Sequence, residues 1–307
     1  MRDLKDYRFA DWLRAVPLAQ GTRRLRNVML DRVYGARRAE GEDRLLIDLA
    51  AVKGGFLAVT VAFNLPEAVS LLSQAMARMM PGVALLVCDN SSDPAARARI
   101  AEICAREGRF YCSLPPVPRI SPNVNGSRSH GVALNWVWRH LIRPSAPATF
   151  ALLDHDLLPL APADLAGHVV RQPVYGMVRH GSDFGGWYLW PGYSVFDFNA
   201  VKDVPLDFGT DTPRTLDTGG QNWRVLYRRM VLDHLQMART RQVWLAAEGE
   251  EAEPFLLVDS WLHVGGAGHR GGGAAALERV RRIYEAAPDA LLPRLLAGTD
   301  AQRVARG

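Results

Sequence analysis

The chain has 307 residues, of which 48% are hydrophobic and 22% charged, with a net charge of +5. This composition is typical of a globular protein with one large domain or two small ones. No run approaches the roughly 18 apolar residues of a membrane helix, and the N-terminus lacks the apolar core of a signal peptide. The three cysteines form no CxxC pair, and no basic stripe carries interleaved aromatics. We therefore expect a cytoplasmic protein with reduced cysteines and no nucleic-acid partner.

Residues 1–50 have the pattern of a helical N-terminal extension. Phe9, Trp12 and Leu13 are spaced for one helix face, and Leu25 and Met29 lie on a second. Between positions 21 and 38 there are six arginines and one acid. Such a segment is either simply solvated or makes peripheral contact with anionic lipid at the inner face of a membrane.

Residues 51–160 alternate between apolar runs and helical patterns. Four runs read as buried strands, and a capped helical pattern follows each of the first two. Strands that alternate with helices predict a parallel sheet covered on both faces, and ligands of such sheets bind beyond the carboxyl ends of the strands. The expected strands are 56–63, 83–88, 109–114 and 150–154.

Two carboxylates, Asp154 and Asp156, fall where the fourth strand leaves the sheet. Acids at that spacing are costly in a core unless a charge compensates them. Magnesium, manganese or calcium would do so, because hard oxygen ligands suit these cations. The alternative is that Asp154 caps a turn and Asp156 points to water.

Beyond residue 160 the chain becomes rich in turn residues and aromatics. We expect a helix from 221 to about 239, a late strand over 255–263, a glycine-rich loop over 265–273 and a final helix. The predicted division is an extension (1–50), a central domain (51–270) and a C-terminal helical tail (271–307). The central domain divides into halves at 51–160 and 161–270, to which the family resemblance below assigns nucleotide and acceptor binding.

Three segments resemble, in the same order, those of nucleotide-sugar glycosyltransferases. They are residues 87–93 (Val-Cys-Asp-Asn-Ser-Ser-Asp), 131–135 (Gly-Val-Ala-Leu-Asn) and 153–156 (Leu-Asp-His-Asp). The resemblance covers roughly residues 56–270 and is closest to the inverting family-two class. It implies an α/β fold of the GT-A kind, a Rossmann-type sandwich with a mostly parallel sheet and helices on both faces. Two departures are the 63–66 loop, which lacks the acidic residue of many relatives, and the Ser-Arg-Ser-His entry at 127–130.

This resemblance implies a metal-dependent enzyme that uses Mn²⁺ or Mg²⁺ and moves a sugar from a nucleoside-diphosphate donor to an acceptor hydroxyl. A bacterial glycan, a lipid-linked saccharide or a metabolite would be the acceptor. Asp154 would face the ribose or the metal, and Asp156 would bind the metal. Asp89 would accept a hydrogen bond from the base, although it also suits a turn. The other expected donor contacts are Phe63, Asn64, Asn90, Arg128 and His130.

The downstream candidates are a base, a third metal ligand and an aromatic acceptor site. An inverting displacement needs a carboxylate that takes the acceptor proton. Asp217 is the first candidate, unless it only caps the following helix, and Asp183 is the second. His263 ends an apolar run before glycines and would ligate the metal or serve the fold. The aromatics expected to line the acceptor site, or to pack a subdomain, are Trp187, Trp190 and Tyr193.

Two alternatives remain open at this stage. The first is a metal-dependent phosphatase of the haloacid dehalogenase type, which also places Asp-x-Asp after a strand. Its nucleophile strand usually opens the domain, whereas three strand units come first here. The second is a nucleotide-sugar binding protein without catalysis. The sequence does not indicate the oligomeric state.

Overall fold

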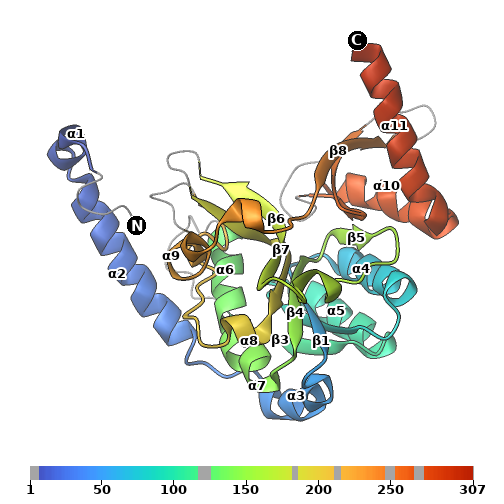
Figure 1. The fold of residues 1–307 in the computed structure, drawn as a ribbon. Helices are drawn as coiled ribbons and strands as arrows, with labels where there is room; N and C mark the ends of the chain where they lie inside the picture. The colour runs from blue at the N-terminus through green and yellow to red at the C-terminus, as the bar shows by residue number, and fades with distance from the viewer. Residues whose placement is uncertain are drawn as a thin grey trace.

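A computed structural model of the chain describes residues 7–116, 126–181, 186–210, 216–245, 253–265 and 273–306. Its centre is a six-stranded sheet of order β3-β2-β1-β4-β7-β6 (Figure 1). The strands are β1 (Phe56–Ala62), β2 (Ala84–Asp89), β3 (Phe110–Ser113), β4 (Thr149–Asp154), β6 (Val174–His180) and β7 (Trp187–Asp197).

The four strands expected from the sequence form the parallel part of this sheet. β1 pairs in parallel with both β2 and β4, and β2 pairs in parallel with β3. β7 and β6 extend the sheet in antiparallel pairing beyond β4. The prediction of an α/β fold with a mostly parallel central sheet is therefore confirmed.

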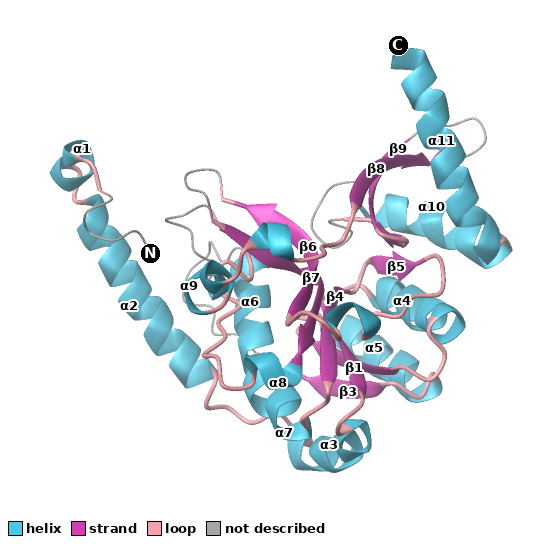
Figure 2. Ribbon diagram, viewed as in Figure 1, coloured by secondary structure: helices cyan, strands magenta, loops and turns pink. Residues whose placement is uncertain are grey.

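Alternating side chains of β1 enter two different cores. Leu57, Val59 and Val61 pack on one face together with helix α6, whereas Ala58 and Ala62 pack on the other with helices α4 and α5. Successive residues of a strand point to opposite faces, so an unbroken apolar run indicates burial on both sides. Figure 2 shows helices on both sides of the sheet, as expected.

A second, four-stranded sheet of order β5-β10-β9-β8 stands beside the first. Its strands are antiparallel, and helices α10 and α11 pack against them in a third core. Leu158 and Leu257 lie in this core, which also receives Leu71 of α4. Its strands are β5 (Leu157–Pro159), β8 (Thr240–Leu245), β9 (Glu253–Val258) and β10 (Trp261–His263).

The helices include a long N-terminal pair, α1 and α2, that lies at the edge of the molecule (Figure 1). No helix in the described part of the chain is both long and apolar enough to span a bilayer. The α-helices are α1 (Phe9–Leu13), α2 (Val16–Tyr34), α3 (Glu42–Leu49), α4 (Pro66–Met79), α5 (Pro94–Arg106), α6 (Gly126–Val137), α7 (Arg143–Ser145), α8 (Phe198–Val201), α9 (Asn222–Val225), α10 (Gly273–Ala286) and α11 (Leu291–Arg306).

Two expectations for the second half of the chain are wrong. The helix expected over 221–239 is α-helical only over Asn222–Val225, and two short 3₁₀ turns follow. Its apolar spacing arises because Leu226 and Tyr227 fold over the core; the Tyr227 ring lies 4.9 Å from that of Trp187. The single late strand is a hairpin, β9 and β10, whose turn holds Asp259 at φ +52°. Aspartate tolerates that left-handed conformation, so no glycine or proline marks the turn.

Candidate metal and active site

Asp154 and Asp156 lie at the carboxyl edge of the parallel strands. Asp154 is the last residue of β4, opposite Val61 of β1. Asp156 belongs to the two-residue turn before β5, and its side chain is only 7% exposed. Between them, His155 places Nδ1 3.1 Å from the carbonyl oxygen of Val61 and so ties this turn to the end of β1. The sequence offered no hint of that role beyond the position of His155 between two candidate ligands.

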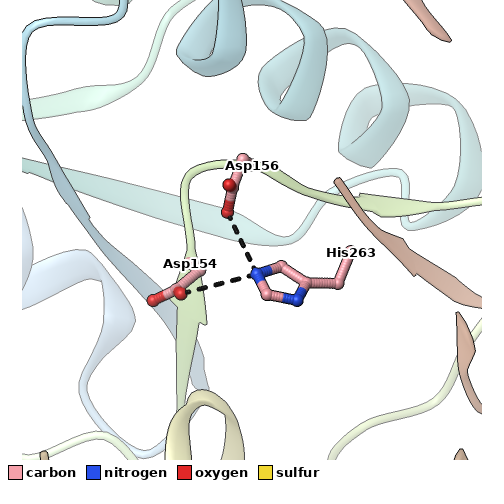
Figure 3. A group of neighbouring side chains, drawn as sticks. All are labelled: Asp154, Asp156 and His263. Carbon is pink, nitrogen blue, oxygen red and sulfur yellow. Dashed lines mark ion pairs between the residues drawn. The ribbon is translucent and has the colours of Figure 1, made fainter. Parts of the chain in front are cut away.

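His263 reaches the same point from the second sheet. It ends β10, where it pairs with Leu157, the residue next to Asp156. The amide of Val264 donates to the carbonyl oxygen of Asp156 at 3.1 Å, which holds the two segments together. His263 Nε2 lies 3.5 Å from Asp156 Oδ1 and 3.9 Å from Asp154 Oδ2 (Figure 3). Pairing of β5 with β10 therefore assembles the cluster from distant parts of the chain.

These three side chains have the chemistry and spacing of a cation site. They form a group of potential ligands whose atoms all lie within 4.8 Å of one another. Ligands about 2.1 Å from one ion are about 3 Å apart at right angles and about 4.2 Å apart when opposite. The two separations from His263 Nε2, 3.5 Å and 3.9 Å, fall within that range. Two carboxylates and one imidazole suit Mn²⁺ or Mg²⁺.

The histidine of the cluster interacts electrostatically with both carboxylates. Burial by itself lowers the pKa of His263, but the hydrogen bond to Asp156 and the charges of Asp156 and Asp154 outweigh it, so the pKa is raised. A protonated ring between two carboxylates compensates part of their charge. A bound cation would replace that proton, so the cluster can hold either a proton on His263 or a metal cation.

Two further predicted residues border the cluster from α6 and the loop before α9. His130, in the first turns of α6, has Nε2 4.0 Å from Asp154 Oδ1. Burial lowers its pKa, although the charges of Asp154 and Asp217 act in the opposite direction. Asp217 is exposed, and the adjacent Thr218 hydroxyl donates to the carbonyl oxygen of Ser127 in α6.

Asp217 does not cap the following helix. Gln221 is the residue that precedes α9, and no side chain caps that helix. Asp217 Oδ1 instead accepts the amide of Thr218 at 2.8 Å, and its own amide donates to the Tyr188 hydroxyl at 3.2 Å. The sequence did not single out this contact of Tyr188, since the neighbours of Tyr188 are aromatic too. Asp183, the second candidate base, lies outside the described residues.

One strand, β1, lies between Asp89 and Asp154. Asp89 pairs with Ala62 of β1, and Asp154 pairs with Val61, so both acids flank the end of β1. At about 4.8 Å per strand, their backbones are about 10 Å apart across the sheet. The Asp89 side chain is fully buried, accepting the Ser91 amide at 2.8 Å and the Tyr111 hydroxyl at 3.1 Å.

The other predicted donor contacts cross-link the loops at this edge. Asn64 has φ +50°, and its Oδ1 accepts the amides of Ser92 and Asp93, which follow β2. Asn90 Nδ2 donates to the Ser129 hydroxyl of α6 at 3.0 Å. Phe63, half-buried, follows β1 directly.

Arg128 is engaged away from the metal cluster. Its guanidinium donates to Asp31 Oδ1 of α2 at 2.6 Å, forming an ion pair. The positive charge that the sequence assigned to the phosphates is therefore compensated by α2 in this arrangement.

Only one of the three predicted acceptor aromatics lies against the cluster. The Trp190 ring is 4.7 Å from the ring of His263. Trp187 is buried against Tyr227. Tyr193 lies in the core that α4 and α5 form with the sheet, and its hydroxyl donates to Asp259 at 3.0 Å.

Comparison with known proteins adds distant structural likenesses only. No protein-family model matches the chain, and no curated protein does. One similar solved structure is that of galactosyltransferase LgtC in complex with donor and acceptor sugar analogues. It is 14% identical to this chain, with a TM-score of 0.33, and the match covers 48% of this chain and 59% of the LgtC chain. Staphylococcus aureus TarS is 13% identical with a TM-score of 0.35, covering 50% of this chain and 30% of that one. Mannosyl-3-phosphoglycerate synthase from Rubrobacter xylanophilus is 14% identical with a TM-score of 0.34, covering 76% of this chain and 95% of that one. The chain thus spans less than two thirds of LgtC and of TarS, and likenesses this weak carry no argument about function.

Proposed function

We propose that this chain is a metal-dependent glycosyltransferase that moves a sugar from a nucleoside-diphosphate donor to an acceptor hydroxyl. The observation that carries the proposal is the group formed by Asp154, Asp156 and His263 at the carboxyl edge of a parallel sheet. Ligands of such sheets bind at that edge. The ordered resemblance of residues 87–93, 131–135 and 153–156 to nucleotide-sugar enzymes supports sugar transfer as the reaction.

Each residue has a role that follows from its contacts. Asp154, Asp156 and His263 would hold Mn²⁺ or Mg²⁺, which supplies a Lewis acid for the charge that a departing nucleoside diphosphate gains. His130, close to Asp154 and with a pKa lowered by burial, offers a hydrogen-bonding group beside the cluster. Asn64, Asn90 and Phe63 form the neighbouring loops and would border the nucleoside.

Asp89 has fewer free hydrogen-bond acceptor sites for a donor base than a carboxylate without partners would have. Both of its oxygens already accept hydrogen bonds, from Ser91 and Tyr111. A carboxylate has about four lone-pair sites, so one remains on each oxygen for the imide of a uracil or thymine base. Because the side chain is fully buried, a base would reach it only after the residues that cover it shift.

Asp217 is the proposed base, and inversion at the anomeric carbon is the proposed stereochemistry. Its carboxylate is exposed, and the adjacent Thr218 contacts Ser127 of α6, the helix that also carries His130. This contact supports a place for Asp217 near the cluster. Trp190, against His263, would offer an aromatic face to a sugar ring.

The proposal is tested by donor binding and turnover in the presence of manganese. We expect a nucleoside diphosphate to raise the melting temperature only when Mn²⁺ is present, and a matching sugar donor to release nucleoside diphosphate when acceptors are supplied. Replacing Asp217 by Asn should reduce kcat by about 10²- to 10⁴-fold, the usual contribution of a general base. The metal-dependent melting shift should stay unchanged.

The matched control is Asp203→Asn, an exposed aspartate just after α8. It should leave both kcat and the melting shift unaltered. Donor binding without turnover under a broad acceptor screen would favour a binding protein, and hydrolysis of a simple phosphate ester would favour a phosphatase. Either outcome contradicts the proposal.

A further inference from the structure

Helix α2 presents its largest apolar side chains to solvent. Leu18, Leu25 and Met29 are 67%, 63% and 61% exposed. At about 100° per residue, these three positions lie within about 40° of one another and form one stripe. Val28 and Val33, also exposed, lie on its two flanks. We call this surface the α2 stripe.

The opposite face of α2, turned toward the protein, carries both polar and apolar side chains. Gln20, Asn27 and Asp31 are partly buried there, and Tyr34 is buried in the core. Gln20 accepts a hydrogen bond from the Tyr7 hydroxyl, and Asp31 pairs with Arg128. A helix that packs on a core usually exposes its polar side, whereas α2 also exposes large apolar side chains. The α2 stripe is therefore available for a surface outside this chain.

Helix α1, at the outer end of α2, also exposes large apolar side chains to solvent (Figure 1). Phe9 and Leu13 are 78% and 74% exposed, and Trp12 is 46% exposed. Tryptophan is favoured where one side of its ring is in an apolar layer and the other in water.

The charges beside the α2 stripe favour an anionic partner. Arg32 and Arg26, both exposed, lie about 40° and 80° to either side of its centre. Arg14, also exposed, lies between α1 and α2. The single acid of α2, Asp31, is already paired with Arg128. In a dimer through this face, arginines of both copies would meet without an acid of α2 to compensate them.

We propose that the arm formed by α1 and α2 docks on an anionic lipid surface. The α2 stripe and the aromatic side chains of α1 enter the boundary between headgroups and acyl chains, and the flanking arginines contact lipid phosphates. This inference rests on the arm alone and holds whatever reaction the site at the sheet edge performs.

The test is co-sedimentation of the full chain with vesicles of phosphatidylcholine, with and without phosphatidylglycerol. We expect binding to the anionic vesicles that weakens with added salt. The double variant Leu25→Ser/Met29→Ser should bind about a hundredfold more weakly, because two apolar side chains no longer leave water. Replacing Arg26 and Arg32 by Gln should weaken binding about thirtyfold, since each arginine near an anionic surface contributes separately.

The control variants are Val170→Ser and Val231→Ser, which remove exposed apolar side chains elsewhere and should leave binding unchanged. All substituted positions are exposed, and unchanged melting temperatures would show that each variant folds. Absence of binding, equal binding to neutral vesicles, or binding that Leu25→Ser/Met29→Ser leaves intact overturns the proposal. A dimer that this double variant dissociates, without vesicle binding, would assign the stripe to a second copy instead.

Discussion

Substitution of Asp156 by Asn tests the cation site most directly. The side chain keeps its shape and loses its charge, at a position that is only 7% exposed. The backbone carbonyl of Asp156 accepts the Val264 amide, so this link between the two segments does not require the carboxylate. The expected change therefore concerns metal affinity more than folding.

The magnitude follows from the charges around Asp156. At an effective dielectric constant of about 20, unit charges 4 Å apart attract by about 4 kcal/mol, so a divalent ion in direct contact with this carboxylate gains more than about 8 kcal/mol. Binding of the ion displaces the attraction between this carboxylate and a protonated His263 at 3.5 Å, which is about 5 kcal/mol on the same scale. The difference exceeds about 3 kcal/mol, which corresponds to a loss in affinity of at least about a hundredfold.

Calorimetric titration of Mn²⁺ into the wild type, Asp156→Asn and Asp203→Asn measures this loss. The exposed Asp203 serves as the control, since its substitution removes the same charge far from β4 in the sequence. If Asp156→Asn bound Mn²⁺ within about threefold of the wild type, or if Asp203→Asn lost as much, the assignment of the site would fail.

Two further predictions concern proton linkage and packing. Because the pKa of His263 is raised above its ordinary value of 6.5, Mn²⁺ affinity should fall about tenfold for each pH unit below that pKa. Titrations at several pH values measure this, and a flat response would contradict it. A Cβ at Gly131 would lie 2.6 Å from the carbonyl oxygen of Phe208, so Gly131→Ala should lower the free energy of unfolding by about 1–3 kcal/mol. Gly21→Ala, in helix α2 with nothing within 4 Å, should raise it by up to about 1 kcal/mol. Urea unfolding compares the two, and equal shifts would refute the packing argument.

Local patterns determine the strand that carries the metal acids. The continuous apolar runs of β1, β2 and β4 indicate strands buried on both faces. Parallel strands bring their carboxyl ends to one edge, which is why Asp89 and Asp154 could be expected at neighbouring places. The helix cap expected after the second strand is Asp93, which accepts the Ala95 amide at 3.0 Å.

The positions of His263, Arg128 and the aromatic side chains depend on contacts between distant segments, which local sequence patterns do not contain. His263 joins the acids because β10 pairs with β5, and Arg128 turns to α2 because Asp31 is placed beside it. Trp187 has the same aromatic character as Trp190, yet it is buried against Tyr227. Periodicity reports which residues leave water, but it does not report which distant segment covers them. The strands and the acids at their ends can thus be predicted from the sequence alone. The position of His263 beside these acids, and the other side chains around them, are decided by how the two sheets pack.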